Sequence, residues 1–264
     1  MALRAAAFAL FVCCAAPASA QLGAATQSPP PEGIAEGEGA GNPKGDYHTL
    51  DALPDWGGIW FVAGGASGGT GPPAMPKLKG DYLARYQAWR AEVVANDGVV
   101  RRPRSNCSPP GMPRIMRLGQ YPYEFLFTPG RITINQEAWM QTRTIWTDGR
   151  AHKEEPDPTF MGDSIGHWEG DTLVVETVAI LDTLEIDTGM PHSDQFRLTE
   201  RIHLSPDDPN QLINEMRMED PEALEEPFEV TVRYRRDRHG SLIEFQCAEN
   251  DRNPVDEEGN TEFL

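Results

Sequence analysis

The stretch SIGHWEGDTLVVET, residues 164–177, has the pattern of two β-strands joined by a tight turn. Its Glu-Gly-Asp centre is typical of a turn, and the flanking segments are rich in the β-branched and aromatic residues that strands favour. In the second half, period-2 alternation places Leu173 and Val175 on one face and Glu176 on the other, between two valines. Both faces are apolar enough to be buried, so the carboxylate of Glu176 is expected to need a partner inside the protein.

The same alternation of short strands and turns continues through the second half of the chain. Pro-Gly and Asp-Gly pairs punctuate it, and no helical segment separates one strand from the next. The strand candidates are residues 122–127, 131–137, 139–146, 164–168, 172–180, 195–204, 211–218, 228–236 and 241–249. We therefore predict a mainly β fold, an antiparallel up-and-down β-barrel, formed by a single domain over residues 51–264.

Ahead of these strands the sequence predicts one further strand, one helix and a long coil. Residues 54–65 are the first strand candidate. Residues 81–96 carry aromatic side chains at helical spacing, with Asp81 as the expected N-terminal cap and Gly98 after the end. Residues 99–120 contain four prolines and no sustained period, which is typical of an ordered coil.

The N-terminus has the features of a secretory signal. One positive charge at Arg4, an apolar stretch and the small residues Ala-Ser-Ala predict cleavage after Ala20. We therefore expect a periplasmic or secreted protein, and no other apolar stretch approaches the ~20 residues needed to span a bilayer. Residues 21–50 are rich in Pro, Gly and Ala and are expected to be a disordered leader.

The chain is strongly acidic. It carries 23 Lys and Arg against 41 Asp and Glu, a formal net charge of −18. Loss of Arg4 with the predicted signal brings the mature chain to −19. Such a field repels nucleic acids and anionic membranes, so neither is an expected partner.

Two cysteines remain after the predicted signal is removed. Cys107 and Cys247 would then lie in an oxidising compartment, where a disulfide can persist. We predict this bond, which would close a loop of roughly 140 residues. The alternative is a pair of buried free thiols.

Two resemblances accompany this pattern. Gly58-Ile59-Trp60, at the start of the first strand, resembles the Gly-x-Trp opening of lipocalin-type calycin barrels. In addition, a series of segments between residues 54 and 250, among them CSPPGMPR (107–114) and WEGDTLVVET (168–177), is similar to a group of uncharacterised secreted bacterial proteins. The first implies a calycin-like barrel; the second brings no activity and no catalytic residue.

Candidate site residues follow from polar side chains on apolar strand faces. Glu200 interrupts the apolar face of residues 195–204, so Glu200 and Glu176 are two carboxylates expected in dry surroundings, where they could act as general acid or base. The alternative is that each is held in a fixed ion pair, with Arg143 as a nearby guanidinium. Such a pair could also orient a polar ligand.

His192 is a further candidate because it lies in the loop Met-Pro-His-Ser-Asp, and loops on a rigid β scaffold often carry chemistry. His152 lies in a similar setting. The mature chain has no zinc-binding spacing of His and Cys, no Gly-x-Ser-x-Gly nucleophile motif and no phosphate-binding loop. We therefore predict no metal and no cofactor.

These observations support two main hypotheses of function. The first is a periplasmic, cofactor-independent lyase, isomerase or hydrolase that acts on a small apolar or aromatic molecule in the barrel through Glu200, Glu176 or His192. In it, Arg143 would fix an oxyanion or a carboxylate. The second is a non-catalytic small-ligand-binding protein of calycin type. A third, weaker hypothesis is an envelope interaction module, which a filled barrel would favour. The sequence does not indicate the substrate, the ligand or the oligomeric state.

Overall fold

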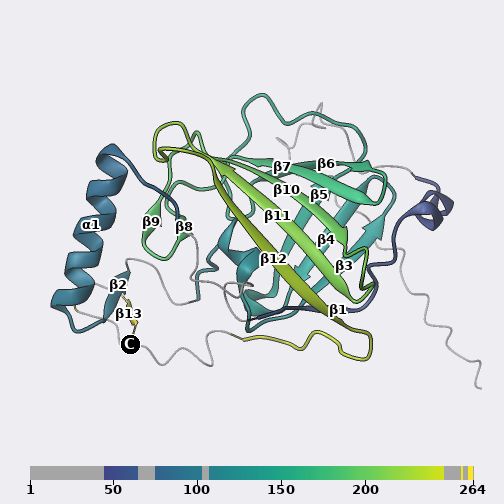
Figure 1. Cartoon of the computed structure of the whole chain (residues 1–264), viewed down its shortest axis with the longest axis horizontal. Coiled ribbons are helices and arrows are strands. Elements are labelled where there is room, and N and C mark those ends of the chain that lie inside the picture. Colours follow the sequence, from purple (N-terminus) through teal and green to yellow (C-terminus); the bar gives the residue numbers. More distant parts are fainter. Residues whose placement is uncertain (1–44, 65–74, 103–106, 247–256, 258–260, 264) are drawn as a thin grey trace, which may run out of the picture. The chain divides into compact units, whose positions relative to one another are not determined.

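The computed structural model describes residues 45–64, 75–102, 107–246, 257 and 261–263. Within them, nine strands form a closed barrel in the order β1-β12-β11-β10-β7-β6-β5-β4-β3, with β3 pairing back to β1 (Figure 1). The strands are β1 (Ile59–Val62), β3 (Tyr123–Thr128), β4 (Arg131–Gln136), β5 (Gln141–Trp146), β6 (Asp163–Glu169), β7 (Thr172–Val178), β10 (Arg197–Leu204), β11 (Gln211–Glu219) and β12 (Phe228–Asp237). The predicted mainly β barrel is confirmed.

The prediction that the barrel is antiparallel throughout is wrong at one place. β5 and β6 run parallel, with Ile145 opposite Ser164 and Trp146 opposite Ile165. Strand directions can alternate around a closed ring only if the number of strands is even, so a ring of nine needs at least one parallel pair. The connection over residues 147–162 returns the chain along the barrel and makes this pair possible.

The strand predictions differ from the structure mainly at the C-terminal end. Residues 241–246 form no strand, and residues 247–249 lie outside the described part of the chain. The ninth position in the barrel is filled instead by β1, from the first strand candidate. Cys247 also lies outside the described residues, so its pairing with Cys107 stays a prediction.

The remaining elements are not strands of the barrel. They are η1 (Tyr47–Ala52), α1 (Gly80–Ala95), β2 (Val100–Arg102), η2 (Arg114–Arg117), η3 (Ala138–Met140), β8 (Glu185–Asp187), β9 (Met190–Pro191) and β13 (Thr261–Phe263). α1 lies beside the hairpin of β8 and β9 (Figure 1). Among the described residues, no helix has the length and apolar character needed to cross a membrane.

The predicted helix 81–96 is confirmed, but its predicted cap is wrong. Lys79 occupies the N-cap position without a side-chain hydrogen bond, and Asp81 lies within the first turn. The predicted coil 99–120 contains β2 and η2 as short regular pieces. The predicted signal peptide and leader lie outside the described residues up to residue 44, and η1 covers the last residues of the predicted leader.

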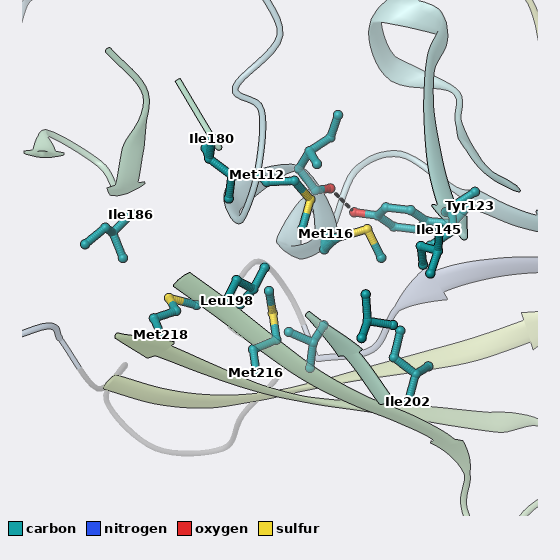
Figure 2. Packing of buried hydrophobic residues seen from close by; sticks show 14 of the residues in the cluster. Met112, Met116, Tyr123, Ile145, Ile180, Ile186, Leu198, Ile202, Met216 and Met218 are labelled. Carbon is teal, nitrogen blue, oxygen red and sulfur yellow. Dashed lines mark hydrogen bonds between the residues drawn. The ribbon is translucent and has the colours of Figure 1, made fainter. Parts of the chain in front are cut away.

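The interior of the barrel is filled with side chains. Trp60, Tyr123 and Tyr234 are fully buried, and Met112 and Met116, which lie in or next to η2, pack among the strand residues (Figure 2). The hydroxyl of Tyr123 donates to the carbonyl of Ile115 at 2.7 Å, and that of Tyr234 donates to the carbonyl of Met116 at 2.6 Å. These bonds fix η2 to the barrel, as expected for a small barrel whose inner residues fill it.

Candidate functional site

A group of polar side chains, here called the polar belt, lies on the inner wall of the barrel. Its members come from consecutive strands of the ring: Arg143 from β5, Ser164 from β6, Thr177 from β7, Glu200 from β10 and Asn214 from β11. All five are buried. Side chains of a strand alternate between the two faces of the sheet, and these five lie on the face that points into the barrel.

Glu200 lies in the interior, as expected, and its partner is Arg143. Its Oε2 accepts a hydrogen bond from Nη2 of Arg143, and its Oε1 accepts one from Nδ2 of Asn214 at 2.8 Å. Both carboxylate oxygens are therefore engaged by neighbouring strands. This arrangement corresponds to the fixed ion pair that the sequence left open as the alternative to acid–base chemistry.

Arg143 is held by more than its ion pair. Its Nη2 donates to Thr177 Oγ1 at 2.9 Å, and its Nε donates to Ser164 Oγ at 3.3 Å. The two hydroxyls are 2.9 Å apart. Such bonds offset the cost of moving a guanidinium and a carboxylate out of water. Nη1 of Arg143 and Oδ1 of Asn214 have no hydrogen-bond partner among the described residues, so the polar belt contains one donor group and one acceptor that are not used.

The prediction that Glu176 occupies a dry interior position is wrong. The side chain of Glu176 is 46 % exposed on the outer face of β7, where its Oε1 lies 3.2 Å from Nη1 of Arg197. Nε2 of His152 lies 3.4 Å from the same oxygen. The valines beside Glu176 are half-buried on the outer surface of the barrel. Their apolar side chains therefore do not indicate a face that points into the interior.

His152 belongs to this outer cluster and not to the barrel interior. Its Nδ1 lies 2.8 Å from Oδ2 of Asp163, which fixes the orientation of the ring. A carboxylate that orients an imidazole is an arrangement found in general-base catalysis. Here, however, the other ring nitrogen faces Glu176, which pairs with Arg197, and the result is a polar network that ties together β6, β7 and β10.

His192 is buried in the connection between β9 and β10, away from the polar belt. Its Nδ1 lies 2.7 Å from the carbonyl oxygen of Ser193, and its ring packs against Phe196 with centroids 4.8 Å apart. Burial holds the pKa of His192 below its ordinary value, while backbone carbonyls and the carboxylates of Asp220 and Asp182 oppose this shift. His192 is therefore part of the packing of this connection and is not open to a ligand.

Acidification is expected to weaken the fold through His192. Because its folded-state pKa lies below the ordinary value of about 6.5, the unfolded chain takes up the proton first as the pH falls. The stabilising contribution is therefore present above about pH 6.5 and is lost as the pH falls through the lowered folded-state pKa.

Urea denaturation at about pH 7.5 and pH 5 would measure this contribution, at about 1.4 kcal/mol for each unit of pKa difference. His192→Phe cannot titrate and should show a smaller loss of unfolding free energy between the two values. An equal loss in both proteins would contradict the prediction.

Sequence reasoning missed two residues that the structure brings into these clusters. Asn214 is the polar residue on an otherwise apolar inner face, between Leu212 and Met216, so the signal that identified Glu200 could also have identified it. Asp163 gave no such signal, because its role depends on the position of the 147–162 connection. Among the described residues, no group of three His, Cys, Asp or Glu side chains is placed to hold a metal ion.

A pocket lies at the seam where the barrel closes. β1 and β3 pair through Ile59↔Glu124 and Trp60↔Tyr123, and beyond these two pairs the described residues before β1 form no ladder with β3. The space between them, here called the seam pocket, has a volume of about 360 Å³. It is lined by Leu50, Leu53, Pro54, Asp55, Trp56, Gly57, Phe125, Leu126 and Phe127.

Aromatic side chains form the inner wall of the seam pocket. Trp56 packs edge-to-face against Phe125, Phe127 and Trp168, each with a centroid distance of 5.4 Å. Its indole Nε1 is buried and has no hydrogen-bond partner among the described residues. Leu126 is 43 % exposed and presents an apolar side chain beside the opening.

The polar side of the seam pocket is held by two ion pairs of Asp55. Asp55 accepts from Nη1 of Arg236 at 3.2 Å and from Nη2 of Arg238 at 2.7 Å. These contacts, chiefly the hydrogen bond from Arg238, hold the pKa of Asp55 below its usual value. The guanidinium of Arg236 also lies over the ring of Trp60 at 4.5 Å, so the segment before β1 is tied to the barrel wall.

Comparison with known proteins adds no family to this description. No protein-family model matches the chain, and no curated protein matches it.

Proposed function

We propose that this chain is an exported, non-catalytic barrel protein that binds a small apolar or aromatic ligand in the seam pocket. The observation that carries the proposal is an aromatic-walled pocket of about 360 Å³ at the point where β1 and β3 separate. Pockets for small molecules are mostly apolar, have a few placed polar groups and begin at about this size. The filled, closed barrel would serve as the rigid scaffold for this site.

Binding is better supported than catalysis because the predicted catalytic groups are engaged elsewhere. Both oxygens of Glu200 are occupied inside the barrel, Glu176 pairs with Arg197 on the outer surface, and His192 is enclosed by its loop. None of these three lines the seam pocket. The hypothesis of a cofactor-independent lyase, isomerase or hydrolase therefore has less support than the ligand-binding alternative.

The resemblance to calycin barrels is consistent with this proposal. Gly58-Ile59-Trp60 leads into β1, the strand that closes the barrel, and Trp60 is completely buried. In this chain, however, the interior is filled, which counts against a ligand inside the barrel and on this point favours the interaction-module hypothesis. The seam pocket supports binding at the barrel wall instead, and the ligand site is therefore proposed there. The similarity to uncharacterised secreted proteins and the signal-like N-terminus support an extracytoplasmic location.

Binding of N-phenyl-1-naphthylamine, a neutral apolar dye whose fluorescence rises in apolar sites, tests the proposal. Wild-type protein should bind the dye, and Leu126→Glu should weaken binding by at least about tenfold, because it brings a charge to the apolar opening. The matched control is Val94→Glu on α1, where Val94 is 74 % exposed and far from the pocket in the chain. Absence of dye binding, or equal weakening by both variants, would contradict the proposal.

A further inference from the structure

The two edges of β3 are paired to different extents, one along its whole length and the other only at its start. On one side all six residues of β3 pair with β4, from Tyr123↔Gln136 to Thr128↔Arg131. On the other side β1 pairs with Tyr123 and Glu124. None of the described strands pairs with residues 125–128 on that side, and this edge forms one wall of the seam pocket.

The turn after β3 determines which backbone groups face the seam. Pro129-Gly130 joins Thr128 directly to Arg131, and such a two-residue connection makes the flanking residues a hydrogen-bonded pair. Hydrogen-bonded pairs alternate along an antiparallel ladder, so Leu126 also directs its N–H and C=O toward β4. The N–H and C=O of Phe127 are then directed toward the seam.

We propose that the ligand of the seam pocket is a neutral molecule with a secondary amide, whose N–H binds to the unpaired edge of β3. The inference rests on the proposed function and names the ligand class of the same site. The amide N–H would donate to the C=O of Phe127, which is one of the hydrogen bonds that extended peptides make with exposed sheet edges. Its apolar part would pack against Trp56, Leu53 and Leu126.

The charges around the pocket favour a neutral ligand over an anionic one. Asp55 contributes a carboxylate to the lining, and its two arginine partners are already engaged with it. The net charge of −18 also repels anions at long range. A small neutral amide with an aromatic or branched apolar group fits the volume of the seam pocket, can bind to the unpaired edge of β3 and is not repelled by the negative charge of the protein.

Two probes of nearly the same shape test the inference: N-(1-naphthyl)acetamide and 1-naphthyl acetate, which replaces the amide N–H by oxygen. The amide should bind the full-length protein about three- to tenfold more tightly, the usual net effect of one hydrogen bond. N-methyl-N-(1-naphthyl)acetamide, which also lacks the donor, should bind as weakly as the ester. In ¹⁵N-resolved NMR spectra, the backbone amide nitrogen of Thr128, which is bonded to the C=O of Phe127, should shift strongly with the secondary amide and little with the other two probes.

The outcomes separate this inference from the proposed function. If all three probes bind equally and Leu126→Glu still weakens them, the seam pocket binds apolar ligands without a hydrogen bond to the edge of β3, and the inference is overturned while the proposed function stands. If none of the probes and no N-phenyl-1-naphthylamine bind, both fail. Preferential amide binding with a shift at Thr128 supports both.

Discussion

Replacing Glu200 with glutamine is expected to lower the free energy of unfolding by about 3–5 kcal/mol, because the change leaves the buried guanidinium of Arg143 without a counter-charge. Glu200 and Arg143 are almost completely excluded from solvent, with side-chain exposures of 0 % and 2 %. Glutamine keeps the volume and can still bond to Asn214, so the loss reports the charge and not a cavity. Chemical denaturation followed by tryptophan fluorescence gives the difference.

Two further variants make this result specific to the buried pair. Glu176→Gln removes a carboxylate of the same type from an exposed pair with Arg197 and should change stability by no more than about 0.5 kcal/mol. Replacing Arg143 and Glu200 together by methionine and leucine should recover part of the loss, since an apolar pair of similar volume leaves no buried charge unpaired, while the amide of Asn214 loses its acceptor. A small effect of Glu200→Gln would mean that the carboxylate is not needed to neutralise Arg143.

The position of Glu200 could be predicted from sequence because it depends on a local pattern. In residues 195–204 the apolar side chains fall on one face and Glu200 lies among them, so alternation alone places it inside. The same argument failed for Glu176, because both faces of its strand carry valines. Only the pairing of β7 with β6 and β10 shows which face is the interior.

The strands of the barrel could be predicted, but the way it closes could not. Turn chemistry and alternation identified the segments from β3 to β12 with small errors at their ends. The parallel pairing of β5 with β6 depends on how the 147–162 connection crosses the barrel, and no local pattern encodes it. The seam pocket likewise results from the separation of two segments some 70 residues apart in the chain, near Trp56 and near Leu126.

The close approach of Gly162, just before β6, to the end of β7 can be tested by substitution. It has φ +68°, in the left-handed region, and a Cβ built there would lie 2.6 Å from the carbonyl oxygen of Val178 and 2.7 Å from Cγ2 of Thr177. Gly162→Ala is therefore expected to destabilise by about 2–5 kcal/mol, from backbone strain together with crowding against β7. Because Thr177 contacts Arg143, the variant should also disturb the polar belt.

Gly170 provides the matched control, because it lies at the other end of β6 with φ +61° and has no atom within 4 Å of an added Cβ. Gly170→Ala carries the backbone strain without the crowding and should cost about 1–2 kcal/mol. The difference between the two variants in chemical denaturation then measures how closely the start of β6 approaches the end of β7. Equal losses in the two variants would contradict the close approach of Gly162 to the end of β7.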